Sequence, residues 1–93
     1  MIDCNIQPDW KPQVCSSVIE QVVDNELVLL DQDREQVYVL NTLAAAIYDL
    51  CDGNASVREI IMTLESHLKP SGIDLKHETC RFLSDMLEKE VLK

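Results

Sequence analysis

Basic residues and glycine are both scarce in this sequence. Only 8 Lys and Arg stand against 17 Asp and Glu, so the net charge is −9 over 93 residues. A chain this acidic repels phosphate backbones, and nonspecific binding to nucleic acid is therefore not expected. The 2 glycines, Gly53 and Gly72, each fall at a predicted helix end or turn. A glycine-rich loop that cradles a phosphate is thus excluded.

Long apolar runs are missing as well. No run approaches the roughly 18 residues that span a bilayer, and the first residues lack a basic stretch followed by an apolar one. We therefore expect no signal peptide, no membrane partner and a cytoplasmic location. The length suits one small domain, in which a deep enzyme cleft is hard to build.

The cysteines lack the spacing of a zinc or redox motif. Cys4, Cys15, Cys51 and Cys80 include no CxxC pair. An even count is compatible with two disulfides, but without a secretion signal the prediction is reduced, mostly structural thiols. The sequence assigns no role to Cys4 or Cys15.

Catalytic residues do not form a recognisable constellation. His77 and Cys80 lie one helical turn apart, yet nothing beside them predicts a pocket or an oxyanion donor. His67 and His77 have no metal-ligand spacing. The acidic residues fall in turns and on polar helix faces, which is typical of solvated surface. We predict no enzymatic activity, no metal and no other cofactor.

The chain is organised as a polar arm, a β-rich region and a helical region. We expect an N-terminal arm over residues 1–15, pinned by Trp10, and one domain over residues 16–93. β-branched and apolar residues predict three short strands, at 17–23, 26–30 and 37–40. Asp24-Asn25 is a two-residue turn signal, so the strands form an antiparallel meander with a free edge.

Capping residues mark the starts of three helices. The predicted helices cover residues 43–51, run from Val57 to about Leu68, and cover 75–89. The predicted caps are Asn41 or Thr42 for the first, Ser56 with Glu59 for the second, and Asp74 for the third. Gly53 is expected to end the first helix as its C′ residue. The core is predicted to include Leu40, Phe82 and Met86.

An ordered set of short motifs gives the sequence a family resemblance. Residues 37–53 read VYVLNTLAAAIYDLCDG, and SVREII and CRFLSDMLEKEVL follow at 56–61 and 80–92. The set resembles the PqqD family, also called the RiPP recognition element, over about residues 12–92. The motif positions are Tyr38, Leu40 and Asn41, Ala44 to Leu50, Asp52 and Gly53, Val57, Glu59 and Ile60, and Phe82 and Leu83. The sequence departs from the family pattern with Tyr48 in place of Trp and Glu90 in place of Gly.

The resemblance implies a fold and a function. The implied fold is α+β and winged helix-turn-helix-like, with a three-stranded antiparallel sheet followed by three helices. The implied function is to bind the leader segment of a ribosomally made precursor peptide and present it to a modifying enzyme, often a radical S-adenosylmethionine (SAM) enzyme. Members of the family typically bind the leader as an added strand along the third strand, over a groove shared with the last helix.

That binding mode suggests which residues contact the peptide. An open strand edge at 37–40 supplies backbone hydrogen bonds, and one flank of helix 75–89 lines the groove. The predicted contacts are Val37, Tyr38, Val39, Leu40, Lys76, Cys80, Arg81, Leu83, Ser84 and Leu87. Arg34, Lys76 and Arg81 are suited to acidic leader side chains. For Leu83 and Leu87, ordinary core packing is an equally good interpretation, because apolar helical spacing alone does not separate the two.

Two other functions compete with leader binding. A winged-helix DNA-binding protein has a similar topology, but the third helix places Lys76, Arg81 and Lys89 against four acidic residues. A docking adaptor without peptide binding is the other alternative. The charge favours a basic partner surface, because residues 1–53 carry −8 and residues 54–93 only −1. The free strand edge is compatible with a monomer or a weak or swapped dimer.

Overall fold

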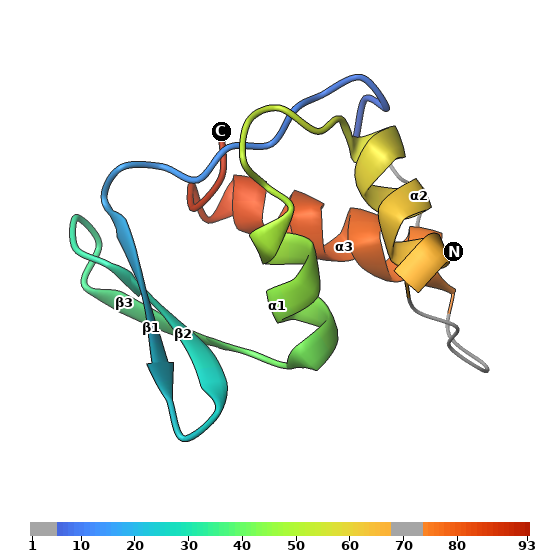
Figure 1. Cartoon of the computed structure of the whole chain (residues 1–93). Coiled ribbons are helices and arrows are strands. Elements are labelled where there is room, and N and C mark those ends of the chain that lie inside the picture. The colour runs from blue at the N-terminus through green and yellow to red at the C-terminus, as the bar shows by residue number, and fades with distance from the viewer. Residues whose placement is uncertain (1–5, 68–73) are drawn as a thin grey trace.

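Three antiparallel strands are followed by three helices in the computed structural model, which describes residues 6–67 and 74–93 (Figure 1). The strands are β1 (Val18–Val23), β2 (Glu26–Asp31) and β3 (Gln36–Leu40). The helices are α1 (Thr42–Asp49), α2 (Val57–His67) and α3 (Leu75–Glu88). This is the predicted α+β architecture. Leu68, Gly72 and Cys4, which entered the sequence predictions, lie outside the described residues.

The sheet has the order β1-β2-β3, so β2 is central and β3 is an edge strand. Asp24 and Asn25 connect β1 to β2 with φ angles of 51° and 68°. Positive φ at both positions defines the turn whose twist matches a tight hairpin, and the predicted two-residue turn is confirmed. Around the second turn, the Oδ1 of buried Asp31 accepts the N–H groups of Asp33 and Arg34.

The predicted N-caps are confirmed. The Asn41 side chain accepts the Ala44 N–H at 2.8 Å, and Asp74 accepts the His77 N–H at 3.1 Å. Ser56 and Glu59 form a reciprocal capping box: the Glu59 carboxylate accepts the Ser56 N–H at 2.9 Å, and Ser56 Oγ accepts the Glu59 N–H at 3.2 Å. Short local motifs therefore fix where each helix begins.

The predicted role of Gly53 is wrong. Helix α1 ends at Asp49 with Leu50 as its C-cap, so Gly53 lies in the following loop instead of at C′. Its φ is 83°, and its N–H donates to the Pro12 carbonyl at 2.9 Å. A Cβ at Gly53 would stand 3.2 Å from the Gln13 side chain. The glycine thus permits a close approach of the N-terminal segment.

The segment from residue 6 to 15 is bound to the helical half of the molecule. The Trp10 carbonyl accepts the Val57 N–H at 2.8 Å, and the Trp10 side chain packs against the core. Gln13 and Lys93 exchange two backbone hydrogen bonds, at 3.1 and 2.9 Å. The expectation that Trp10 pins this segment is confirmed.

The core lies between one face of the sheet and the helices. Its buried members come from every described element except β1: Leu29, Leu40, Ile47, Tyr48, Cys51, Val57, Ile60, Leu64, Leu75, Leu83, Met86, Val91 and Leu92. Leu40 and Met86 are confirmed as core residues, but Phe82 is only half-buried. Leu83, one position further along α3, has no exposed surface.

The cysteines differ in state. Cys15 and Cys51 are free thiols, whereas Cys80 is disulfide-bonded, so the prediction of reduced thiols is wrong for Cys80. Burial, together with the nearby Asp52 carboxylate, raises the pKa of Cys51 to about 12. Its Sγ donates to the Ile47 carbonyl at 3.3 Å, and the residue packs as a small apolar side chain.

Across the two described ranges, no helix is long and apolar enough to cross a membrane.

Candidate functional site

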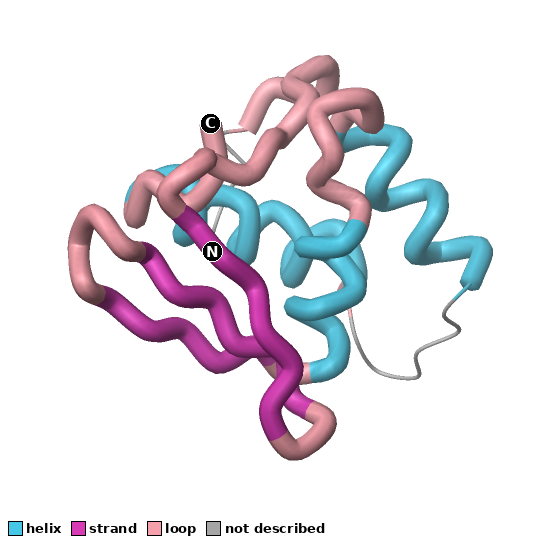
Figure 2. Tube along the Cα trace, turned by 60° about the vertical axis from the view of Figure 1, so that its left-hand side comes forward, coloured by secondary structure: helices cyan, strands magenta, loops and turns pink. Residues whose placement is uncertain are grey.

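The free edge of β3 is the first component of the candidate site. β3 pairs with β2 on one side, and residues from Gln36 to Leu40 have no described strand on the other. An edge strand presents unpaired N–H and C=O groups to any chain that can extend alongside it. Figure 2 shows the strands as a layer with the described helices to one side.

Side chains alternate across β3 as the sequence predicts. Leu40 is buried and Tyr38 half-buried on the face that meets the helices. Val37 and Val39 point to the opposite face and are 60% and 59% exposed. The edge therefore separates an inner face, which continues into the helical layer, from an apolar outer face.

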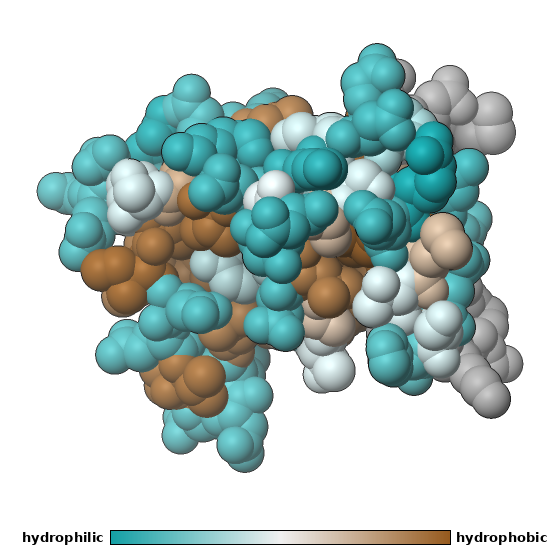
Figure 3. Space-filling model, turned by 45° about the horizontal axis from the view of Figure 1, so that its top comes forward, coloured by the Kyte–Doolittle hydropathy of each residue, from teal (hydrophilic) through white to brown (hydrophobic). Residues whose placement is uncertain are grey.

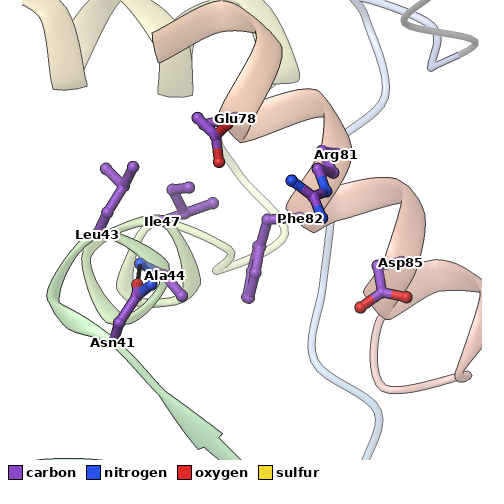
Figure 4. Close-up of a pocket in the computed structure, with 8 residues that line it drawn as sticks. All are labelled: Asn41, Leu43, Ala44, Ile47, Glu78, Arg81, Phe82 and Asp85. Carbon is purple, nitrogen blue, oxygen red and sulfur yellow. Dashed lines mark hydrogen bonds between the residues drawn. The ribbon is translucent and has the colours of Figure 1, made fainter. Parts of the chain in front are cut away.

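A cavity of about 420 Å³ lies between α1 and α3, and it begins at Asn41, immediately after β3 ends (Figure 4). The lining residues are Asn41, Leu43, Ala44, Ile47, Glu78, Arg81, Phe82 and Asp85. Figure 4 shows the Phe82 ring extending from α3 toward the α1 side chains. The lining is mixed: apolar side chains come from α1 and Phe82, and polar ones from Asn41 and the charged residues of α3.

At the other end of β3, charged residues connect the strand to α3. Lys89 Nζ lies 5.9 Å from the centre of the Tyr38 ring and 2.6 Å from Asp85 Oδ1. Arg34, in the turn before β3, forms an ion pair with Glu90. These contacts bridge the strand and the helix at one end, and the cavity opens at the other.

The flank of α3 that faces this region differs from the predicted one. Glu78, Arg81, Phe82 and Asp85 line the cavity, and Lys89 continues the same row by one further helical turn. Of the residues predicted on α3, only Arg81 belongs to this row. Sequence reasoning missed the others because it placed Phe82 in the core.

The remaining predicted residues of α3 lie elsewhere. Leu83 is fully buried, as the core interpretation describes, and Ser84 is exposed. Leu87 lines a second hollow next to Arg34 and Glu90. Lys76 and Cys80 line a third hollow with residues of α2, away from β3. The predicted groove residues are therefore distributed around three sides of the helix.

The spacing of apolar residues in α3 indicates which side of the helix faces the core. Leu75, Thr79, Leu83 and Met86 are all buried, and they recur at intervals of four, four and three residues. This spacing defines one helical stripe, and Phe82 lies at its edge, about 55° from its centre, which agrees with a half-buried side chain. Within residues 6–67 and 74–93, no group of three or more His, Cys, Asp or Glu is placed to hold a metal ion.

Comparison with solved structures defines the class of fold. The chain is similar to "Lasso peptide synthetase B1 complexed with the leader peptide", with a TM-score of 0.74, 21% identity, and coverage of 89% of this chain and 98% of that one. It is also similar to "TbiB1 in Complex with the TbiA(beta) Leader Peptide", with a TM-score of 0.73, 20% identity, and coverage of 87% and 94%. At these identities the likeness shows a shared fold.

The sequence itself identifies the family. The family described as "Coenzyme PQQ synthesis protein D (PqqD)" matches residues 26–92, which is most of the chain. The chain therefore belongs to the PqqD family, as its motifs indicate. None of the curated proteins matches the sequence.

Proposed function

We propose that this chain binds the leader segment of a ribosomally made precursor peptide by strand addition to β3 and presents it to a modifying enzyme. The observation that carries the proposal is the continuity of the free β3 edge with the cavity between α1 and α3. Family membership supports it, as do the structural neighbours, which are themselves complexes with leader peptides.

Strand addition explains how one small domain can hold peptides of varied sequence. Backbone hydrogen bonds to residues 37–40 require no particular side chain and each contribute about 0.5–1.5 kcal/mol. Alternate side chains of an added strand point inward, toward the space between β3 and α3. Selectivity then depends on the side chain that reaches the cavity.

The cavity favours an apolar leader side chain. Leu43 and Phe82 provide the apolar part of a mixed lining, so an aliphatic or aromatic group that packs against them removes apolar surface from water. Arg81 beside the cavity suits an acidic neighbour in the leader, and Glu78 and Asp85 suit a basic one. We include Val37, Tyr38, Val39, Leu40 and Arg81 among the proposed contacts.

A titration with the leader peptide of the adjoining precursor gene tests the proposal. We expect saturable amide shifts in 15N-labelled protein at residues 37–40 and 81–85, because these segments border the added strand. A peptide of the same composition in scrambled order is the control. Silence of both segments at saturating leader would contradict strand addition at β3.

The proposal assigns no catalytic step to this chain. The family resemblance favours a radical SAM enzyme as the one that receives the peptide. We propose that the chain acts in the cytoplasm, as a monomer or a weak or swapped dimer. Purification of the enzyme encoded beside this gene, with assay of its iron–sulfur content, tests the first point. Sedimentation equilibrium of the chain alone tests the oligomeric state.

A further inference from the structure

The face of the sheet that points away from the helices is apolar. Strand register places Ile19, Leu30 and Val37 in one cross-strand row, and Val28 beside Val39 in the next. Ile19, Val37 and Val39 are each more than two-fifths exposed. Figure 3 shows apolar side chains gathered over the strands, with hydrophilic side chains around them.

This outer face has no described structural role. The core uses the opposite face, where Leu29 and Leu40 are buried, and the described helices lie on that side (Figure 2). Isolated exposed apolar residues are normal, but neighbouring rows on one sheet face are typical of a contact surface. The row of Ile19, Leu30 and Val37 crosses all three strands, whereas Gln21 occupies the β1 position beside Val28. The surface is therefore continuous with β3 without including its backbone edge.

The charge around the outer face is predominantly negative. Residues 16–40 contain the acidic residues Glu20, Asp24, Glu26, Asp31, Asp33 and Glu35. Their only basic residue is Arg34, which is paired with Glu90 of the segment after α3. Asp24 and Glu26 lie at the β1–β2 turn, and Asp33 and Glu35 at the opposite end of the sheet. The apolar rows are therefore bordered by uncompensated carboxylates at both ends.

We propose that this outer face docks a second protein whose contact surface is apolar at its centre and carries Lys and Arg at its edge. The inference rests on the proposed function in one respect: the partner is the modifying enzyme that receives the peptide. Charge complementarity selects this occupant, because a second copy or an anionic membrane would bring further negative charge against the same acidic ends.

Variants on β1 and β2 test the docking surface without altering β3. In Ile19→Thr with Val28→Thr, both new side chains are polar and β-branched, so strand propensity is retained. The matched control is Val22→Thr, since Val22 is 73% exposed on β1 but points to the other face. Affinity for the purified enzyme of the adjoining gene is measured by calorimetry, without leader and with it.

We expect the double variant to bind the enzyme about tenfold more weakly or worse, because central apolar contacts dominate such interfaces. Leader affinity should change less than about twofold, and Val22→Thr should leave both unchanged. Equal enzyme affinity in wild type and double variant would overturn the proposal. So would a concentration-dependent dimer that the double variant abolishes, because the occupant would then be a second copy.

A second pair of variants tests the charge argument. Asp24→Asn with Glu26→Gln removes two carboxylates at one end of the face, and Asp49→Asn with Glu88→Gln removes two from helices. Only the first pair should slow association and reduce its dependence on salt. Equal effects of the two pairs would contradict a local basic partner surface. If the leader fails to bind while Ile19→Thr with Val28→Thr still loses the enzyme, the leader proposal alone falls.

Discussion

At the scale of single residues, Phe82 and Leu83 have different roles although they are adjacent in α3. Leu83 has no exposed surface and belongs to the core, whereas Phe82 is half-buried and lines the cavity next to β3. One step along a helix rotates the side chain by about 100°. Here that step separates a residue of the core from a residue that lines the proposed binding cavity.

Truncation of Leu83 should therefore affect mainly the stability of the fold, and truncation of Phe82 mainly the binding of the leader. Leu83→Ala is expected to lower the free energy of unfolding by about 2–5 kcal/mol, because it leaves a cavity in the core. Phe82→Ala should weaken leader binding about tenfold or more and destabilise the fold less, since part of its ring is already exposed. Denaturant unfolding and leader titration measure the two effects. A Phe82→Ala protein with unchanged leader affinity would remove the cavity from the binding site.

At the scale of elements, the hairpin turn at Asp24-Asn25 sets the register of β1 against β2. Asn25 has a φ of 68°, a conformation that asparagine tolerates and glycine adopts without strain. Asn25→Gly should preserve or raise the free energy of unfolding, and Asn25→Val should lower it by about 1–2 kcal/mol. Chemical denaturation of both variants checks this. Equal stability of the two would show that the turn does not constrain the hairpin.

The capping box of α2 should make stability depend on pH. Hydrogen bonds from Ser56, first its N–H and then its hydroxyl, hold the pKa of the Glu59 carboxyl below its ordinary value. A carboxyl with a lowered pKa in the folded state contributes stability above its unfolded pKa and loses it as pH falls through the folded pKa. We expect unfolding to become easier below about pH 4, and less steeply so in Glu59→Gln. Glu65→Gln on the same helix is the control, and an equal flattening in both variants would contradict the assignment.

The sequence predicts elements better than it predicts how they rotate against each other. The caps at Asn41, Ser56 and Asp74 are confirmed because capping depends on residues three positions apart. On α3, Met86 is a core residue as predicted and Leu83 follows the core interpretation, but Phe82, the aromatic residue predicted in the core, is only half-buried. The role of Gly53 was predicted wrongly because the contacts that require a glycine there are with Pro12 and Gln13, some forty residues earlier in the chain.

At the scale of the whole molecule, leader binding and enzyme docking should be coupled. Val37 and Val39 belong to the apolar outer face, and the same residues belong to the strand that the leader extends. We expect the leader to increase enzyme affinity and the enzyme to increase leader affinity by one common factor, as thermodynamic linkage requires. Calorimetry of each binding step with the other ligand present or absent measures the factor. A factor of one in both directions would show that the two events are independent.

The position of β3 at the sheet edge has a consequence for recognition. An added leader would turn β3 into an interior strand and would place its own outward side chains in line with Val37 and Val39. The enzyme would then touch a composite surface, partly protein and partly substrate. Such a surface would allow the enzyme to distinguish the peptide-bound chain from the peptide-free chain before any chemistry begins.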